Sequence, residues 1–309
     1  MKFLNRAVVY SIIFLGFLYF LWYSKCMNGK RRLLDDDGIS GKVLTCENGI
    51  WYVEDDICQR REDFVRAQLN WEESPAIFVY PTSIDKWVSG RIIREGKWEE
   101  QHIQRIHKIL KSDPSLIFLD IGANVGAFSL TMAELGNRVI AIDALGDNVA
   151  RLCASMKINQ LQNRMSIIHN ALSFKQEKVS LGKFHLNVGG TFVKRMGVSA
   201  NDDVIVIDAI LLDDLLDIYE FEGHVIIKMD VESFEANVLK GASEFFHRVR
   251  VDCVLMEFMA HKGKESGDFI VEFLKQFGLE SEFTNSNHSS WPMDVMFTRR
   301  VKKNKQGSP

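Results

Sequence analysis

A glycine-rich turn after a short apolar run contains the first residues that could carry out chemistry. The turn reads DIGANVG from Asp120 to Gly126. Gly122 allows a sharp turn and a close approach of backbone to a ligand, and Asp120 can accept hydrogen bonds. The next predicted strand ends at Asp143, whose carboxylate could accept hydrogen bonds from both hydroxyls of a ribose. The pattern predicts a nucleoside site at the ends of two neighbouring strands.

Two nucleoside ligands compete for this turn. A dinucleotide needs the spacing Gly-x-Gly-x-x-Gly, because its pyrophosphate contacts bare backbone at a helix N-terminus. The turn lacks that spacing, and Asp120 and Asn124 stand where phosphates would lie. S-adenosylmethionine (SAM) carries a sulfonium, an amino group and a ribose but no phosphate, so it suits an acidic turn. The remaining alternative is an ordinary strand-turn-helix corner that binds nothing.

A second group of charged residues follows a later apolar run. Lys228, Asp230 and Glu232 alternate, so they would share one face of an extended chain, and Glu257 ends the next apolar run. Charges at a buried strand end need partners or a function. They could simply neutralise one another. The three carboxylates could also bind Mg²⁺ or Ca²⁺, but we assign no metal, because no dense ligand spacing is present.

The elements that position these residues alternate between short apolar runs and amphipathic segments. We expect strands over residues 116–120, 138–143, 165–172, 204–207, 225–229, 251–258 and 294–298. We expect helices over residues 99–110, 127–135, 148–158, 234–246 and 268–277. Such alternation implies an α/β fold with a mainly parallel sheet and helices on both faces.

Three segments in this order, DIGANVGAFSL, VIVIDAILLDDLL and IKMDVESFEANVLKGA, resemble the FkbM-type methyltransferases, the membrane-anchored animal-type members most closely. The resemblance runs from about residue 88 to residue 298 and includes the upstream stretch SGRIIREGKWEE. It implies a Rossmann-like SAM-dependent methyltransferase fold with a seven-stranded sheet. Two positions depart from the family: Ser233 stands where glycine is usual, and Asp143-Ala144 where Glu-Pro is frequent.

The motifs and the resemblance together assign a site. The expected SAM-binding residues are Asp120, Gly122, Ala123, Asn124, Gly126, Asp143, Asn170 and Ala171. The expected catalytic residues are Asp230, Lys228, Glu232 and Glu257. Asp230 is the first candidate for the base that takes the proton of an acceptor hydroxyl. Lys228 would adjust the basicity of Asp230 or bind an acidic acceptor. Glu232 and Glu257 would orient the acceptor. Trp98 and Glu99 are expected near the cofactor.

The expected function is O-methylation of a glycan or another small hydroxyl-bearing molecule by in-line transfer from SAM. A SAM-binding module without catalysis, and a nucleotide-dependent oxidoreductase on a similar fold, are the alternatives. The 309 residues carry a net charge of -3, which argues against a basic nucleic-acid reader, so we expect no nucleic-acid partner. The sequence does not predict an oligomeric state.

The chain begins with an apolar run without charges over residues 7–24. It predicts an uncleaved transmembrane anchor (residues 1–24), with a cleaved signal peptide as the alternative. A charged stalk (25–45), a cap (46–113), the methyltransferase domain (114–298) and a basic tail (299–309) would follow.

Two features favour a lumenal domain on a single-pass membrane protein of the endoplasmic reticulum or Golgi. Cys46 and Cys58 are close enough in sequence for a disulfide, and Asn287 begins an acceptor sequon. A positive-inside count of the flanking charges would instead leave the domain in the cytoplasm.

Overall fold

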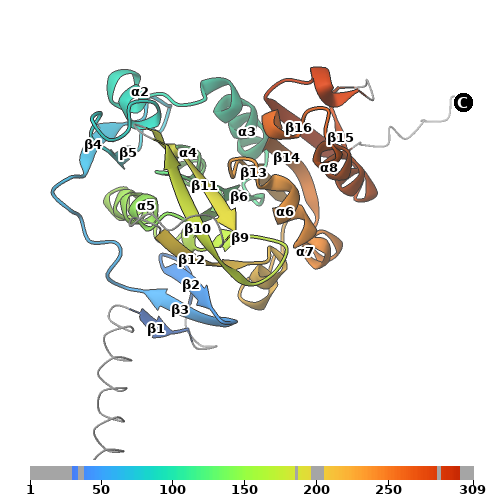
Figure 1. Ribbon diagram of the computed structural model, residues 1–309. Coiled ribbons are helices and arrows are strands. Elements are labelled where there is room, and N and C mark those ends of the chain that lie inside the picture. The colour runs from blue at the N-terminus through green and yellow to red at the C-terminus, as the bar shows by residue number, and fades with distance from the viewer. Residues whose placement is uncertain (1–29, 34–37, 185–186, 196–204, 284–286, 300–309) are drawn as a thin grey trace, which may run out of the picture.

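The computed structural model describes residues 30–33, 38–184, 187–195, 205–283 and 287–299, and Figure 1 shows them arranged around one large sheet. Across the sheet the strands are β1 (Lys30–Arg32), β3 (Ile50–Glu54), β2 (Val43–Glu47), β8 (Met165–His169), β7 (Arg138–Asp143), β6 (Ile117–Ile121), β13 (Val225–Met229), β14 (Val251–Glu257), β16 (Asp294–Arg299) and β15 (Leu279–Ser281). The strands from β2 across to β14 pair in parallel, whereas β16 is antiparallel to both neighbours. The mainly parallel sheet expected from the sequence is confirmed.

The described sheet has ten strands, so the expected number of seven is wrong. Strand β2 pairs in parallel with β8, and β3 and β1 add two further antiparallel strands beyond it. Asn48 and Gly49 join β2 to β3 with positive φ values of 52° and 75°. Two such residues form the tight hairpin turn whose twist matches that of the flanking strands. The extension therefore follows from a local Asn-Gly signal.

Two hydrophobic clusters lie on opposite faces of the sheet, because successive side chains of a strand point to opposite sides. Phe118 belongs to one cluster and its neighbour Leu119 to the other. The Phe118 cluster includes residues of α3 (Glu100–Ser112), α4 (Ala127–Glu134) and α5 (Gly146–Ile158). The Leu119 cluster includes residues of α6 (Glu235–Lys240), α7 (Ser243–Arg248) and α8 (Glu265–Gln276). Helices thus cover both faces, as a buried parallel sheet requires.

Two elements differ from their expected form for local reasons. The helix expected over residues 234–246 is two short helices, α6 and α7, which are separated near Gly241. A Cβ atom at Gly241 would lie 2.2 Å from the carbonyl oxygen of Ser173, so the two backbones approach closely there. The strand expected over residues 165–172 divides at Asn170, because β9 (Ala171–Leu172) pairs with β12 in a second sheet.

The other elements form two smaller sheets and short helices. The second sheet has the order β11-β10-β12-β9, with β10 (Glu177–Phe184), β11 (Asn187–Arg195) and β12 (Ile205–Ile210). Before α3 lie the paired strands β4 (Val65–Gln68) and β5 (Ala76–Val79) and the helix α2 (Val88–Glu95). Three 3₁₀ helices, η1 (Asp213–Asp217), η2 (Met259–His261) and η3 (His288–Ser290), complete the described elements.

The prediction of a single-pass membrane protein with a lumenal domain is contradicted, and we do not retain it. In the part of the chain that the structure describes, no helix has the length and apolar character that a bilayer crossing requires. The longest described helices, α3 and α5, have 13 residues each, against about 20 for a span. The apolar run over residues 7–24, on which the prediction was based, lies outside the described residues.

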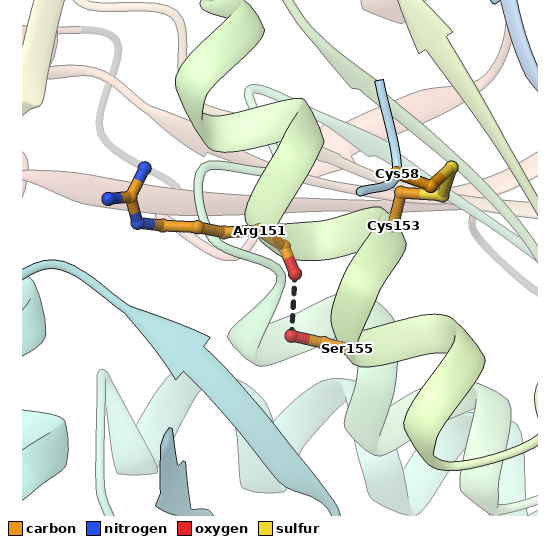
Figure 2. Close-up of a disulfide and its surroundings, with 4 residues drawn as sticks. All are labelled: Cys58, Arg151, Cys153 and Ser155. Carbon is orange, nitrogen blue, oxygen red and sulfur yellow. Dashed lines mark hydrogen bonds between the residues drawn. A yellow bond between two sulfur atoms is a disulfide. The ribbon is translucent and has the colours of Figure 1, made fainter. Parts of the chain in front are cut away.

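The expected disulfide between Cys46 and Cys58 is wrong. Cys58 is bonded to Cys153 of α5 (Figure 2), and Cys46 is a buried free thiol. Cys46 belongs to the hydrophobic cluster on one face of the sheet, whereas Cys58 and Cys153 belong to the cluster on the other. The central sheet therefore separates Cys46 from Cys58 despite their closeness in sequence. Burial raises the pKa of the Cys46 thiol to about 11, so it stays protonated at neutral pH.

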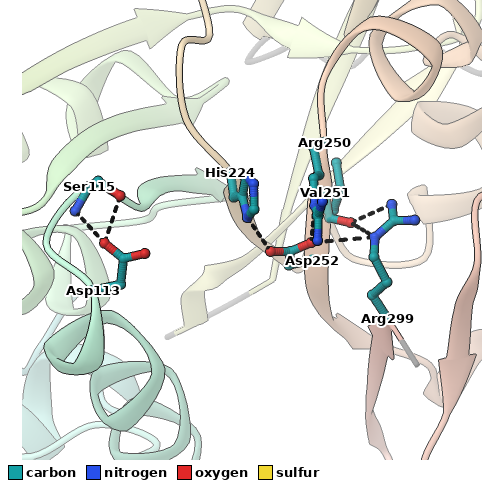
Figure 3. Close-up of polar contacts among 7 residues, drawn as sticks. All are labelled: Asp113, Ser115, His224, Arg250, Val251, Asp252 and Arg299. Carbon is teal, nitrogen blue, oxygen red and sulfur yellow. Dashed lines mark hydrogen bonds and ion pairs between the residues drawn. The ribbon is translucent and has the colours of Figure 1, made fainter. Parts of the chain in front are cut away.

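Polar contacts connect the N-terminal ends of β13 and β14. Asp252, near the start of β14, contacts His224, Arg250 and Arg299 (Figure 3). His224 directly precedes β13, and Arg250 directly precedes β14. Its oxygens lie 2.6 Å from His224 Nδ1 and 3.0 Å from Arg250 Nε. These partners hold the N-terminal ends of the strands together. A cavity lies at the opposite ends of the strands.

Candidate active site

A cavity of about 260 Å³ lies at the C-terminal ends of β6, β7, β13 and β14. In an open parallel sheet this edge is where ligands bind, because the loops that follow the strands meet there. Ten of the twelve site residues expected from the sequence line it: Gly122, Ala123, Asn124, Asp143, Asn170, Ala171, Lys228, Asp230, Glu232 and Glu257. The other two, Asp120 and Gly126, do not line it. Residues of the segment before β6, including Trp98 and Glu99, close the cavity from the side.

The glycine turn is fixed against the strand that carries the charged residues. Gly122 has a φ of 79°, and a Cβ atom there would lie 1.8 Å from the carbonyl oxygen of Asp230. No other residue fits without moving that backbone. The amides of Gly122 and Ala123 both donate to the carbonyl oxygen of Ile142 at 2.9 Å. The turn therefore presents bare backbone to the cavity.

Asp120 and Gly126 support the turn from behind. Asp120 is fully buried, and its Oδ2 accepts a hydrogen bond from Ser129 Oγ at 2.6 Å. Its Oδ1 lies 3.9 Å from Lys228 Nζ and has no hydrogen-bond donor among the described residues. Burial raises the pKa of Asp120. A Cβ atom at Gly126 would lie 2.2 Å from Leu152 Cδ1, so this glycine allows the chain at the start of α4 to approach α5 closely.

Asp143 ties two loops together at the cavity wall. Its Oδ2 accepts from the amide of Asn124 at 2.8 Å, and its Oδ1 accepts from the amide of Leu145 at 2.8 Å and from Asn148 Nδ2 at 3.1 Å. Burial raises the pKa of Asp143, although these hydrogen bonds oppose the shift. Asp143 lines the cavity, and 9% of the residue is accessible.

Asn170 holds the edge where the first sheet meets the second. Its Oδ1 accepts from the amide of Cys46 at 2.8 Å, and its Nδ2 donates to the carbonyl oxygens of Cys46 at 2.9 Å and Asp208 at 3.0 Å. The following residue, Ala171, pairs with Ala209 of β12. The side-chain amide of Asn170 thus has local partners, and the cavity wall there is formed by well-anchored backbone.

Lys228 is a buried cation among acids. Its Nζ donates to the carbonyl oxygen of Gly122 at 2.9 Å and lies 3.4 Å from Asp230 Oδ2. It also lies 5.5 Å from the centre of the Phe128 ring. Burial opposes its charge, but Asp230, Asp120 and Glu99 outweigh burial and raise the pKa of Lys228. Lys228 therefore stays protonated and does not serve as a base.

Five carboxylates, including Asp230, surround the remaining part of the cavity. Burial, with Asp230 and Glu235 nearby, raises the pKa of Glu232 to about 7 and that of Glu257 to about 8. Glu257 Oε2 is buried without a hydrogen-bond partner among the described residues. Burial also raises the pKa of Glu99 to about 7, while Lys228 opposes that shift. Asp294 is the fifth carboxylate.

The sequence interpretation missed Asp294 and Glu235. Asp294 begins β16, and because β16 is antiparallel to β14, its start lies beside Glu257. His102 Nε2 of α3 lies 3.2 Å from Asp294 Oδ2, and this hydrogen bond raises the pKa of His102. The pairing of β14 with β16 is what places Asp294 at the site. The sequence showed only an aspartate before an apolar run.

Glu235 is fully buried beneath the loop that follows β13. Its Oε1 accepts from the amide of Val231 at 2.9 Å, and its Oε2 lies 2.7 Å from His261 Nε2. His261 Nδ1 in turn lies 2.8 Å from Ser266 Oγ. This buried chain, Glu235–His261–Ser266, connects α6, η2 and α8 to the loop that carries Asp230 and Glu232.

A cation site would involve a different trio from the one considered in the sequence. Oxygen atoms of Asp230, Glu235 and Glu257 lie within 4.8 Å of one another, with Glu235 in place of Glu232. Both oxygens of Glu235 already have hydrogen-bond partners, Val231 and His261. We therefore assign no ion to this trio.

Comparison with known proteins identifies a family. The family described as "Methyltransferase FkbM domain" matches residues 120–280, more than half of the chain. A tRNA (guanine(37)-N(1))-methyltransferase of Aedes aegypti is 22% identical over 180 residues, which cover 58% of this chain and 30% of that protein. The chain thus spans less than a third of the length of this relative.

Two solved structures are also similar. Magnesium protoporphyrin IX methyltransferase (ChlM) of Synechocystis PCC 6803, with bound SAM, is 14% identical, covers 65% of this chain and 79% of its own, and has a TM-score of 0.39. The complex of aTrm5 with tRNALeu is 12% identical, covers 81% of this chain and 56% of its own, and has a TM-score of 0.40.

Proposed function

The chain belongs to the FkbM methyltransferase family and is a SAM-dependent methyltransferase; from this premise we propose that it methylates a hydroxyl of a small-molecule acceptor or glycan. The observation that carries this proposal is one cavity with two different walls. A bare glycine turn and Asp143 form one wall, and a cluster of carboxylates forms the other. A hydroxyl is a weak nucleophile that needs a base, and the second wall offers carboxylates suited to that role.

The first wall fits SAM better than a phosphate-bearing cofactor. Lys228 is the one Lys or Arg among the described residues that line the cavity, and its ammonium is already engaged with Gly122 and Asp230. A pyrophosphate would therefore find acids and no available counter-charge. SAM supplies an electrophilic methyl group on a cationic sulfur when it binds. We assign Gly122, Ala123, Asn124, Asp143, Asn170 and Ala171 to its binding, and Asp120 and Gly126 to support of the turn.

The second wall offers a proton acceptor and a proton donor to one hydroxyl. Asp230 is the proposed base, positioned by Lys228. A carboxyl with a pKa of about 8, such as that of Glu257, is mostly protonated at neutral pH and can donate a hydrogen bond to the acceptor oxygen. Glu257 and Glu232 would thus orient the hydroxyl while Asp230 receives its proton. Because the Lys228 ammonium is engaged, it does not hold an acidic acceptor in this proposal.

Titration of SAM followed by a labelled-methyl assay over hydroxyl-bearing acceptors tests the proposal. Asp143→Ala should weaken SAM binding. Asp230→Asn should lower kcat by about 10²–10⁴-fold, the usual range for a general base, with SAM affinity within about twofold. Glu272→Gln, an exposed glutamate of α8 outside the cavity, is the matched control and should leave both unchanged. Undiminished turnover in Asp230→Asn would remove Asp230 from the mechanism.

A nucleic-acid acceptor is the competing possibility, because the Aedes aegypti relative is named for methylation of tRNA. The net charge of -3 and the acidic cavity favour a small acceptor instead. Phosphate contacts by Lys and Arg supply most of the affinity of nucleic-acid binding. Transcribed tRNA therefore belongs in the same assay, and robust labelling of it would replace the small-molecule proposal.

A further inference from the structure

The charges of the cavity are unevenly distributed between its two walls. Asp143 is the one carboxylate among the lining residues on the side of β6 and β7. Five carboxylates lie on the other side, around β13, β14 and the start of β16, and we call them the acidic wall: Glu99, Asp230, Glu232, Glu257 and Asp294. The acidic wall surrounds the space beyond the glycine turn, where an acceptor would bind.

The acidic wall has little compensating positive charge. Lys228 already contacts three oxygen atoms, of Gly122, Asp120 and Asp230. His102 faces Asp294 from α3, and its Nε2 lies 3.2 Å away. Lys86 lies outside the lining residues, with its Nζ 6.0 Å from the centre of the Trp87 ring. These groups leave an excess of carboxylates in a partly buried space, which disfavours an anionic acceptor.

Aromatic and apolar side chains complete the mouth of the cavity. Trp98 is half-buried and lines it, while Trp87 and Met293 line it with 61% and 57% of their surfaces exposed. Apolar side chains grouped around a cavity offer a surface on which the apolar part of a ligand can pack. An ammonium group is attracted to the face of a tryptophan ring, and neighbouring carboxylates add a coulombic attraction.

We propose that the acceptor carries a protonated amine near the hydroxyl that is methylated, and that the acidic wall and Trp98 bind this ammonium group. The proposal depends on the function proposed above and specifies its acceptor class. Neutral polyols are the nearest alternative, since carboxylates also accept hydrogen bonds from hydroxyls. A bound cation would stabilise the ionised forms of Glu99 and Glu232, whose pKa values burial raises to about 7 in the free protein, while Glu257 keeps its proton for the acceptor oxygen.

Three probes of similar shape distinguish these acceptor classes. Benzylamine, benzyl alcohol and benzoate share one ring and differ in charge. Each is titrated at neutral pH into the full-length protein saturated with S-adenosylhomocysteine, which lacks the sulfonium charge. We expect benzylamine to bind about tenfold more tightly than benzyl alcohol, from one unit charge facing partly buried carboxylates, and benzoate to bind most weakly.

A matched pair of aspartate variants tests the source of this preference. Asp294 and Asp268 each pair with a histidine, His102 and His288, but only Asp294 lines the cavity. Asp294→Asn should reduce the preference for benzylamine over benzyl alcohol by about fivefold, and Asp268→Asn should leave it unchanged. Trp98→Leu should weaken the binding of all three probes.

Each contrary result has a definite meaning. Benzyl alcohol or benzoate binding as tightly as benzylamine would overturn the ammonium proposal, as would an unchanged preference in Asp294→Asn. Absence of binding by every probe would also overturn it. These results do not bear on SAM binding or methyl transfer, which the SAM titration and the labelled-methyl assay measure separately. Failure to bind S-adenosylhomocysteine would instead contradict the proposed function, and the probes would then be titrated into the free protein.

Discussion

Ser233 stands where the family usually has glycine, and its backbone shows the reason for that preference. Ser233 has a φ of 76° and follows Glu232, which has a φ of 53°. Side chains other than glycine cost roughly 1–2 kcal/mol in this left-handed region. Because glycine also loses more conformational freedom on folding, we expect Ser233→Gly to raise the free energy of unfolding by about 0.5–1 kcal/mol.

Urea unfolding measures this difference, and Ser233→Ala is the control. Alanine removes the same hydroxyl but keeps the Cβ atom that strains the backbone. It should therefore leave the free energy of unfolding within about 0.5 kcal/mol of the wild-type value. Equal stabilisation by alanine and glycine would show that the hydroxyl, rather than the backbone conformation, is unfavourable at this position.

The raised pKa of Glu257 predicts how the stability of the fold changes with pH. Burial raises this pKa from a usual value of 4.5 to about 8. Between these values the folded chain binds more protons than the unfolded chain, so stability falls as pH rises through the interval. Glu257→Gln removes this titration, and its gain in Tm over the wild type should be larger at about pH 8.5 than at about pH 5.

Thermal unfolding at the two pH values gives this comparison directly. Glu272→Gln makes the same chemical change on α8, outside the cavity, and should shift Tm equally at both. A pH-independent effect of Glu257→Gln would mean that the Glu257 carboxyl is not held in its protonated form by the fold.

The loop after β13 is held by one buried side chain, that of Glu235. Glu235 accepts the amide of Val231 and pairs with His261, and it has no exposed surface. Glu235→Ala would leave His261 Nε2 and the amide of Val231 unsatisfied, at a cost of about 3 kcal/mol in unfolding free energy. Glu235→Gln can keep both hydrogen bonds and should cost about 1 kcal/mol or less.

Turnover should respond more sharply than SAM affinity to this change. The loop carries Asp230 and Glu232, so its release in Glu235→Ala should lower kcat at least tenfold. Glu235→Gln should retain most of the activity. Equal kcat in the alanine variant and the wild type, both folded at the assay temperature, would show that the loop keeps its shape without Glu235.

At the scale of elements, the sequence predicted what short-range patterns determine. The parallel strands and the α3 helix have apolar spacings that a single window reveals, such as Ile103, Ile106 and Leu110 on one face. The Cys58–Cys153 bond, by contrast, depends on which face of the sheet each thiol occupies. Glu235 and Asp294 reach the site through a helix start and an antiparallel pairing, and neither relation is local in sequence.

The division of the whole molecule into segments is where the structure adds most to the sequence. The sequence interpretation placed a stalk over residues 25–45 and a cap after it. In the structure β1 lies within residues 25–45, β2 begins within them at Val43, and both strands belong to the central sheet. Thr45 Oγ1 donates to the carbonyl oxygen of His169 at 3.0 Å, and Glu54 Oε2 lies 2.8 Å from His169 Nδ1. The hairpin β2–β3 thus supports the strand end that leads to Asn170.

Removal of this hairpin should therefore damage the cavity from a distance. A chain that begins at residue 56 loses β2 and β3, which exposes the edge of β8 and leaves the Asn170 side chain without the backbone of Cys46. An unpaired buried amide costs about 1–3 kcal/mol, so we expect SAM affinity to fall at least tenfold. A chain that begins at residue 38 keeps both strands and is the matched control for SAM titration and circular dichroism. If the two truncations bind SAM equally well, the wall at Asn170 is held by β8 and β12 alone, and the hairpin is an accessory to the fold instead of a support of the site.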